Sequence, residues 1–410
     1  MAEWRYVEYQ ELASQEQSAF SMGPFGSKIT KDNYVTAGVP VVRGVNLAKG
    51  AFVDDDFVFI TEEKADEIMS ANVEPGDLIF THRGTIGQVS MIPREPRFNR
   101  YVIGSSQVKT RLDEAIARPE FYYYWFRSTE GQQSILANAS TVGVPGIATP
   151  LTSIRKLLVP LPSRGEQDGI VAVLGALDNK IAVNERIAVT YEQLLQSQIE
   201  CMGIEVDPDP ASAVPVTEFV HFNPKVAKPS SEAVYVDMAA LSTHRAGISA
   251  WARREPKGGT RFVNGDTLLA RITPCLENGK TGYVDFMEDG EIGVGSTEFI
   301  VMRSVQGVPP EFSYFLARSK RFREHAIRNM VGSSGRQRVA AADAAEFYLD
   351  RPDRQMLAQF GETASNAFVH MRSLDRESRI LTALRDALLP QLMSGKLRVR
   401  EAEKIVEDAV

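Results

Sequence analysis

Two long stretches of the chain carry apolar side chains at alternating spacings of four and three residues. The first runs from about residue 166 to residue 200, and the second from about residue 354 to Leu389, where Pro390 disfavours continuation of a helix. This spacing is typical of a helix that packs one face against a second helix, although an ordinary amphipathic core helix is an alternative. The expected seam positions are Ile170, Leu174, Leu177, Ile181, Asn184, Phe360, Met371, Leu374 and Leu381. We therefore expect two long helices that pack on each other, with Asn184 fixing their register.

Shorter apolar runs precede each long helix, and the motifs around them recur along the chain. In each half, short β-type runs bounded by turn residues lead to a helix, a Gly/Ser-rich loop and then one long helix. Three motifs recur at offsets of 189 to 191 residues, namely Gly76-Asp77-Leu78 as Gly265-Asp266-Thr267, Gly104-Ser105-Ser106 as Gly295-Ser296-Thr297, and Pro119-Glu120-Phe121 as Pro310-Glu311-Phe312. The sequence therefore predicts a duplicated module of about half the chain.

The repeat and the long helices together predict the domain organisation. The fold class is α+β, with two tandem α/β domains separated by two long helices that form an antiparallel coiled coil, in a pseudo-two-fold arrangement. Three prolines and few apolar residues between Glu205 and Thr217 indicate a linker. The expected boundaries are 1–163 for the first domain, 164–203 for the central helix, 204–217 for the linker, 218–350 for the second domain, 351–400 for the C-terminal helix and 401–410 for a tail.

The composition is that of a soluble globular protein. The 410 residues are 43% hydrophobic and 24% charged, with two cysteines, too few for a disulfide framework. No apolar run approaches the length of a membrane span, and the opening residues lack the pattern of a signal peptide. We expect a cytoplasmic protein in a reducing compartment, without membrane contact.

The net charge is −7, which by itself argues against a nucleic-acid partner. The charge is nevertheless unevenly distributed. Residues 83–111 carry six basic side chains against Glu95 alone, and residues 303–338 carry eight against two acidic ones. Basic side chains gathered on one face can bind phosphates whatever the bulk charge. We therefore expect one basic surface in each half.

The chain offers no recognisable catalytic constellation. Gly279-Lys280-Thr281 is similar to the end of a phosphate-binding P-loop, but Pro274 stands where that loop needs glycine. The five histidines show no pairing with a carboxylate at the spacing of a zinc hydrolase. We expect no catalytic residue, no metal and no cofactor in this chain. A metal-dependent nuclease built from Asp266, Glu277 and Lys280 is a less favoured alternative.

Residues suited to nucleic acid follow a β-type run in each half. Arginine can grip the O6 and N7 atoms of guanine, asparagine can pair with adenine, and serine or threonine can contact phosphate. Glycine-rich loops let the backbone approach phosphate, although each loop taken alone is better explained as a turn that needs glycine. Their recurrence beside basic segments favours binding. The candidate DNA-binding residues are Thr81, His82, Arg83, Thr85, Ser105, Ser106, Thr141, Arg271, Thr273, Asn278, Lys280, Thr281, Ser296, Thr297, Ser333, Ser334, Arg336 and Arg338.

Five motifs spread over nearly the whole chain are distinctive when taken together. They are Glu3-Trp4-Arg5, Pro160-Leu161-Pro162 with Glu166-Gln167, Leu177-Asp178 with Lys180-Ile181 and Asn184, residues 267–280 (TLLARITPCLENGK) and residues 388–397 (LLPQLMSGKL). With these motifs the chain resembles the specificity (S) subunit of type I restriction–modification systems. One departure is the start of the second long helix, where residues 356–362 lack the Glu-Gln and Ile-rich opening of the first.

The resemblance implies two target-recognition domains, each reading one half of a bipartite site in double-stranded DNA. It also implies that methyltransferase (M) subunits, two of them, dock on the helices and use S-adenosylmethionine, and that restriction (R) subunits join through them. A helix from residue 166 to 200 spans about 50 Å. We therefore predict an asymmetric site with an unread gap fixed by helix length, its half-site centres on the order of one to one and a half turns apart. A stand-alone sequence-specific DNA-binding regulator is the alternative.

Overall fold

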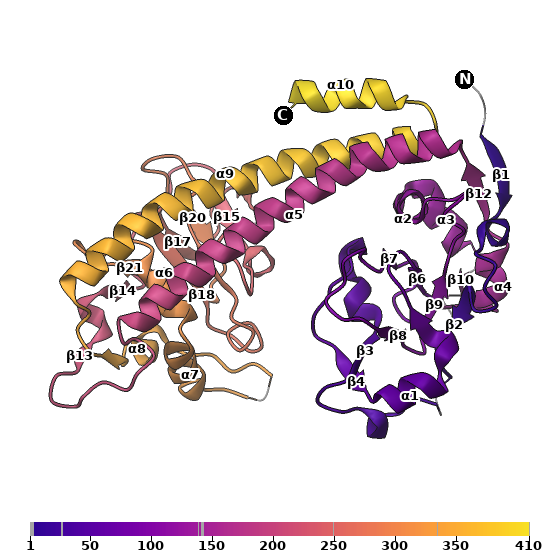
Figure 1. The fold of residues 1–410 in the computed structure, drawn as a ribbon. Helices are drawn as coiled ribbons and strands as arrows, with labels where there is room; N and C mark the ends of the chain where they lie inside the picture. The colour runs from indigo at the N-terminus through magenta and orange to yellow at the C-terminus, as the bar shows by residue number, and fades with distance from the viewer. Residues whose placement is uncertain are drawn as a thin grey trace. The chain divides into compact units, whose positions relative to one another are not determined.

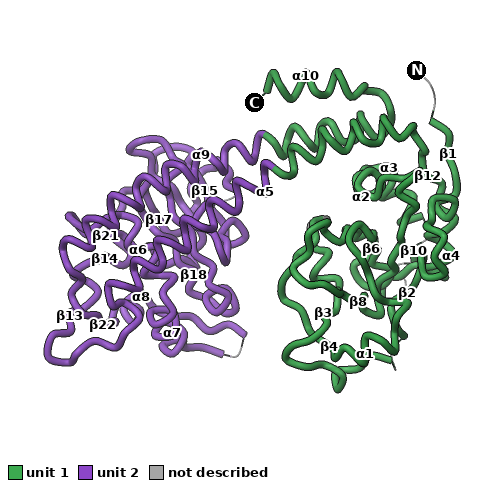
Figure 2. Tube along the Cα trace, viewed as in Figure 1, with its two compact units in different colours: residues 1–179, 381–410 green, residues 180–380 purple. Residues whose placement is uncertain are grey.

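The computed structural model describes residues 4–25, 28–137, 139–140, 143–248, 250–333 and 335–409 (Figure 1). The chain divides into two compact units. Unit 1 comprises residues 1–179 and 381–410, and unit 2 comprises residues 180–380 (Figure 2). The division falls inside both long helices, so each unit contains one part of each helix. Mixed α and β structure around these helices agrees with the predicted fold class.

Unit 1 contains two four-stranded sheets besides its parts of the long helices. Its helices are α1 (Glu62–Glu67), α2 (Pro119–Arg127), α3 (Thr129–Leu136) and α4 (Pro150–Arg155). The first sheet has the order β2 (Phe20–Met22), β9 (Gln107–Thr110), β6 (Leu78–Thr81) and β7 (Val89–Met91). The second has the order β4 (Val58–Ile60), β3 (Val39–Val42), β8 (Tyr101–Ile103) and β5 (Asn72–Val73). Two short ladders join β1 (Arg5–Glu8) to β12 (Leu158–Leu161) and β10 (Ala139–Ser140) to β11 (Gly146–Ile147).

Unit 2 repeats the two four-stranded sheets in the same order. Its helices are α6 (Phe312–Arg318), α7 (Lys320–Arg328) and α8 (Ala341–Ala344). One sheet has the order β14 (Val220–Phe222), β21 (Phe299–Ser304), β18 (Asp266–Ala270) and β19 (Thr281–Tyr283). The other has the order β16 (Ala252–Arg254), β15 (Ala233–Val236), β20 (Gly293–Gly295) and β17 (Thr260–Phe262). A short ladder joins β13 (Val214–Pro215) to β22 (Tyr348–Leu349).

The register of the strands confirms the duplication that the sequence predicts. Within each second sheet one pair is parallel, β3 with β8 in unit 1 and β15 with β20 in unit 2, while the flanking pairs are antiparallel. The turn before β6 and the turn before β18 both place a glycine at φ +90°, Gly76 and Gly265, a conformation that a side chain would strain. The recurring Gly-Asp motif is therefore a turn that the fold requires.

The aspartate of each recurring motif is buried and bound by an arginine. Asp77 and Arg111 pair at 2.8 Å in unit 1, and Asp266 and Arg303 pair at 2.6 Å in unit 2. In unit 2 the two residues lie on the neighbouring strands β18 and β21, and in unit 1 Asp77 directly precedes β6 while Arg111 directly follows the neighbouring strand β9. A buried carboxylate needs such a partner because burial removes its hydration. These charges therefore hold the sheet together and are not free to bind a ligand.

The long helices are α5 (Arg164–Cys201) and α9 (Arg354–Met393), and they run antiparallel. In unit 1, Asp178 of α5 pairs with Arg385 of α9 at 2.7 Å. In unit 2, Asn184 donates from Nδ2 to Glu377 Oε2 at 2.7 Å and to Ser378 Oγ at 3.2 Å. As the residue number increases along α5, the number of its partner on α9 decreases, so the two helices are antiparallel. The seam residues of the sequence prediction are buried, with Ile181 half-buried.

Both helix starts are capped, and the second helix ends later than expected. Ser163 and Glu166 form a reciprocal cap at the start of α5, as the spacing Ser-x-x-Glu favours. Pro390 lies inside α9, which continues to Met393 because the buried side chains of its last turn, Leu392 and Met393, hold that turn in place. Residues expected as a tail form most of helix α10 (Val399–Ala409), and the expected linker contributes strand β13.

Candidate nucleic-acid interface

Three loops that contain candidate DNA-binding residues meet in unit 2. The Arg271 N–H donates to the Glu298 carbonyl, and the Val339 N–H donates to the Arg271 carbonyl, each at 3.0 Å. The Thr273 N–H donates to the Gln337 carbonyl, also at 3.0 Å. The loop after β18, the turn before β21 and the Gly/Ser-rich loop before α8 therefore form one junction, as the sequence motifs suggest.

The junction of unit 2 carries two arginines and one carboxylate. Arg338 reaches Glu298 with Nε at 2.9 Å from each carboxylate oxygen and with Nη2 at 2.8 Å. Arg338 holds the pKa of the Glu298 carboxyl below its ordinary value, and Arg271 adds to the effect. The Nε of Arg271 has no hydrogen-bond partner in the described part of the chain. Glu298 thus offsets the charge of Arg338, whose predicted contact with phosphate stays a prediction, and the unpartnered Nε of Arg271 is buried.

The other candidate DNA-binding residues of unit 2 are either exposed, or buried or hydrogen-bonded within the fold. Asn278, Thr297, Ser333 and Arg336 are exposed, and Ser296 is half-buried. Thr281 is buried at the start of β19, so its predicted contact with DNA needs correction. Lys280 Nζ donates to the Met238 carbonyl at 2.9 Å and Thr273 Oγ1 donates to the Gln337 carbonyl at 3.3 Å, and the contacts of these two residues with DNA stay predictions.

Unit 1 has the same three-loop junction. The His82 N–H donates to the Ser106 carbonyl and the Ile147 N–H donates to the His82 carbonyl, each at 2.9 Å. An isolated bridge links Arg83 to Gly146, as one links Ile272 to Arg338 in unit 2. The repeat therefore brings its recurring loops together at the same place in both units.

The candidates of unit 1 also divide by burial. Arg83, Thr85 and Ser105 are exposed, and Ser106 is half-buried. Thr81 is buried, with Oγ1 donating to Gln88 Oε1 at 3.1 Å, so it is not available to DNA. His82 is buried with Nε2 3.2 Å from the Ser105 carbonyl, and burial lowers the pKa of its ring. The two remaining candidates, Thr141 and Ser334, lie outside the described residues.

Much of the positive charge counted along the basic segments is paired. In residues 83–111, Arg94 pairs with Glu114 and Glu120, Arg100 pairs with Glu62 and Asp66, Arg111 pairs with Asp77, and Lys109 is buried. In residues 303–338, Arg303, Arg321 and Arg338 pair with Asp266, Asp207 and Glu298, whereas Lys320, Arg328 and Arg336 are exposed. Partners from distant segments therefore reduce the available charge, and a basic surface in each half stays a prediction.

Sequence reasoning missed a cleft of unit 2 that borders the junction. Arg254, Lys257, Ser296 and Thr297 are among its lining residues. The available signal was the run of residues 253–261 (RREPKGGTR), which carries four basic side chains against one acidic one. This run is short, and it lies outside both segments whose charge was counted.

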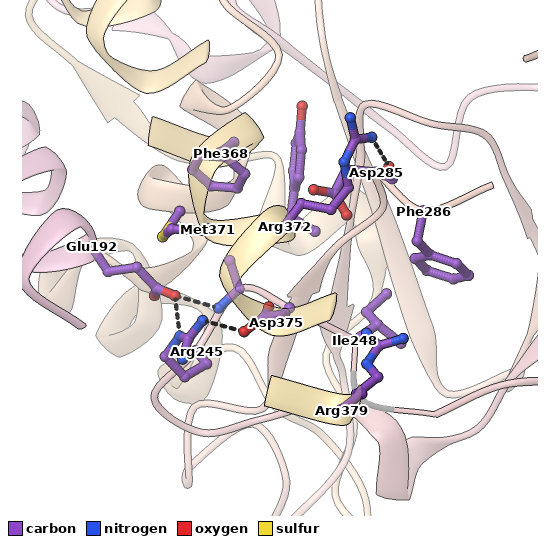
Figure 3. Close-up of a pocket in the computed structure, with 13 residues that line it drawn as sticks. Glu192, Arg245, Ile248, Asp285, Phe286, Phe368, Met371, Arg372, Asp375 and Arg379 are labelled. Atoms are coloured by element: carbon purple, nitrogen blue, oxygen red, sulfur yellow. Dashed lines mark hydrogen bonds and ion pairs between the residues drawn. The ribbon is translucent and has the colours of Figure 1, made fainter. Parts of the chain in front are cut away.

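A second pocket of unit 2 lies between the loop of residues 245–248, residues 283–286 and the long helices (Figure 3). Arg245 is buried there and binds three carboxylates, those of Glu185, Glu192 at 3.1 Å and Asp375 at 3.0 Å. Glu192 also accepts from the Ala246 N–H at 2.7 Å. These paired charges fasten the loop of residues 245–246 to α5 and α9.

The nuclease alternative has no assembled site. Asp266 is 0% exposed and bound by Arg303, and Lys280 is bound to a backbone carbonyl. Across the described ranges, no three histidine, cysteine or acidic side chains are grouped so as to hold a metal ion. The helices described here also include none with the length and apolar content to cross a membrane.

Comparison with known proteins gives consistent matches. A family model of the type I restriction modification DNA specificity domain matches residues 20–192. The type I restriction enzyme EcoEI specificity subunit of Escherichia coli is 25% identical over 275 residues, which are 63% of this chain and 46% of that protein. The EcoAI specificity subunit of Escherichia coli is 34% identical over 141 residues, 32% of this chain and 23% of that protein. The chain thus spans less than half the length of these curated relatives.

One solved structure shares the fold over almost its whole length. The type I restriction–modification S subunit from M. genitalium aligns with a TM-score of 0.53 and 15% identity, covering 95% of this chain and 96% of that one. The domain match, the curated relatives and the common fold agree with the resemblance stated from the motifs. Residues 20–192 of this chain are therefore similar to the type I restriction modification DNA specificity domain, and the chain shares the fold of the type I S subunit from M. genitalium.

Proposed function

We propose that this chain is the DNA sequence-specificity subunit of a type I restriction–modification complex. Each unit reads one half of a bipartite, asymmetric site in double-stranded DNA, and α5 with α9 sets the length of the unread gap. The chain has no catalytic role of its own. Two methyltransferase subunits dock on it and use S-adenosylmethionine, and restriction subunits join the complex through them.

The observation that carries this proposal is one junction built twice with different side chains. In unit 2 it presents Arg271 beside the pair of Arg338 and Glu298. In unit 1 the position of Arg338 is taken by Gly146, and that of Arg271 by the buried His82. Base reading depends on the donors and acceptors that a loop presents. The two units therefore favour different half-sites.

Exposed apolar side chains on the long helices support a protein partner. Val183 and Leu194 of α5 and Val369 and Ile380 of α9 all lie in unit 2, and each is more than a third exposed. Apolar side chains gathered on the outside of a helix pair favour association, because contact with a partner removes them from water. The methyltransferase subunits are the partners that the resemblance supports.

The test is to express this chain with the methyltransferase encoded beside it and to map methylated adenines across the host genome. We expect a split, asymmetric methylated motif that disappears when this chain is omitted, with catalytically inactive methyltransferase as the control. Unchanged methylation without this chain, together with tight binding of one site by the pure chain, would favour the stand-alone regulator instead.

A further inference from the structure

The cleft of unit 2 lies between strands β15, β16 and β20 and the loop that follows β16. It has a volume of about 680 Å³. Two cationic side chains face it, Arg254 and Lys257, and Glu255 is the one carboxylate in its lining. Both cations are exposed, and neither is paired with a carboxylate in the described part of the chain. Arg254 and Lys257 therefore give this cleft unpaired positive charge, as the exposed Arg336 does at the Gly/Ser-rich loop.

The cation of Arg254 is held in place by an aromatic ring. Its guanidinium carbon lies 3.1 Å from the ring centroid of Tyr235 on the neighbouring strand. Contact with the ring face occupies one side of the guanidinium plane and leaves its N–H edges free to donate. A cation fixed in this way loses less side-chain entropy when it binds than a mobile one. Arg254 is therefore preorganised.

The opposite wall of the cleft supplies hydroxyl groups and close backbone. Ser296 Oγ accepts from the Glu298 N–H at 3.1 Å, so its own proton is free to donate, and Thr297 is exposed beside it. At Gly259, where φ is +116°, a Cβ would lie 2.2 Å from the Gly295 carbonyl oxygen. Only glycine allows the loop to run so close to β20. The loop therefore passes close to β20 at Gly259, and the cleft presents cationic and hydroxyl donors beside the single carboxylate of Glu255.

A set of donors with excess positive charge suits a phosphate better than a base edge. A phosphodiester offers only acceptors, whereas base edges present donors as well. The turn of residues 296–298 belongs both to this cleft and to the loop junction, because Glu298 binds Arg338 on its other side. A backbone phosphate in the cleft would therefore lie next to the loops that face the bases.

The repeat shows that the fold does not require this cleft. The strand register places Val41 of unit 1 where unit 2 has Tyr235, and Ile60 where unit 2 has Arg254. Both Val41 and Ile60 are buried in the core of unit 1. Unit 2 thus has Arg254 stacked on Tyr235 where unit 1 has two buried aliphatic residues. This difference indicates that the cleft serves binding and not the fold.

We propose that Arg254, Lys257, Ser296 and Thr297 form a phosphodiester-binding cleft, present in unit 2 and absent from unit 1, that grips the DNA backbone beside one half-site. This inference rests on the proposed function, since it takes DNA as the ligand. It assigns the backbone contact to residues outside the recurring motifs, and it makes the two ends of the site unequal in their salt dependence.

The test measures binding of the full chain to duplex DNA between 50 and 200 mM salt. Each phosphate contact contributes about 0.9 to the slope of log affinity against log salt, so it accounts for about a 3.5-fold loss of affinity over this fourfold range. The double variant Arg254→Met/Lys257→Met should lower the slope by about 1.8 and make the salt effect about 12-fold smaller. The matched control is Arg354→Met/Arg376→Met, which removes two exposed charges from α9 of the same unit and should leave the slope unchanged.

The outcomes separate this inference from the function on which it rests. If the wild-type chain binds DNA only together with the methyltransferase, the slopes are measured on that complex; if neither the chain nor the complex shows salt-dependent DNA binding, the proposed function fails. If the wild type binds and the double variant keeps its slope, or the control loses as much, the cleft is not the phosphate site although the function stands. Thr297→Glu is a second, independent test, because it places a carboxylate in the cleft at an exposed position and should weaken DNA binding. It tests the cleft even if the double variant does not fold.

Discussion

The carboxyl group of Asp285 should make unit 2 less stable at neutral pH than at mildly acidic pH. Asp285 lines the pocket in Figure 3, where burial raises its pKa from 3.8 to about 6. The nearby Arg372 opposes this shift, and Asp375 adds to it. A carboxyl whose pKa is raised by folding favours the folded state while protonated, and this contribution is lost as the pH rises from 3.8 through 6.

The size of the effect follows from the two pKa values. The shift from 3.8 to about 6 corresponds to about 3 kcal/mol at 1.36 kcal/mol per pH unit. Asp285→Asn removes the ionisable group, so the variant should exceed the wild type in stability by about 3 kcal/mol at pH 8 and by about 1.5 kcal/mol at pH 5. The gain in stability therefore grows with pH.

The assay is urea denaturation at pH 5 and pH 8, followed by hydrogen exchange of strands β18 and β21, so that unit 2 is observed separately from unit 1. Asp289→Asn serves as the control because Asp289 is an exposed carboxylate four residues along the chain, and its removal should change stability by less than 0.5 kcal/mol. A gain for Asp285→Asn that is equal at both pH values, or a loss at pH 8, would refute this reasoning.

Three further predictions concern the sheet, the recognition loops and the helices. Arg303→Met orphans Asp266 and should destabilise unit 2 by about 3 kcal/mol in denaturant titrations, whereas Arg253→Met, whose partner Glu291 is bound at the surface, should cost less than 1 kcal/mol; equal costs would show that burial of the pair is unimportant. Arg271→Ala should relax one half of the methylated motif and leave the other half unchanged, and a uniform loss over both halves would show that Arg271 contacts phosphate. Deleting seven residues from α5 and seven from the facing part of α9 should shorten the unread gap of the motif, and an unchanged gap would exclude the helices as the spacer.

The helices and the duplication could be predicted because their signals are local or repeat along the chain. A seam spaced by four and three residues needs no knowledge of distant contacts, and Asn184 lies at the seam with partners on α9 as expected. The turns of Gly76 and Gly265 recur for a backbone reason that is written in the motif itself. Sequence patterns of this kind depend only on neighbouring residues, and the structure contains them where they were expected.

The charges and several candidate contacts could not be predicted, because they depend on residues far apart in the chain. Arg100 is bound to two carboxylates of α1 more than thirty residues earlier, a partnership that no local count contains. Thr81 and Thr281 look like polar residues at strand ends but lie in the core. The sequence did not indicate Arg254, because its proposed binding role depends on Tyr235 and on the turn at Ser296. Only the fold brings these residues close to Arg254.

The division of the chain inside both long helices has a consequence for the order of synthesis. Unit 2 is one continuous segment, residues 180–380, whereas unit 1 needs residues 381–410 in addition to residues 1–179. Domains form as units while the ribosome elongates the chain, and usually the N-terminal one is completed first. Here unit 2 can complete its core before unit 1. Residues 1–179 cannot complete unit 1 until the end of α9 and α10 have been synthesised. A nascent chain stalled beyond residue 380 would therefore carry a finished unit 2 and an open unit 1, with the apolar face of the first part of α5 exposed to chaperones.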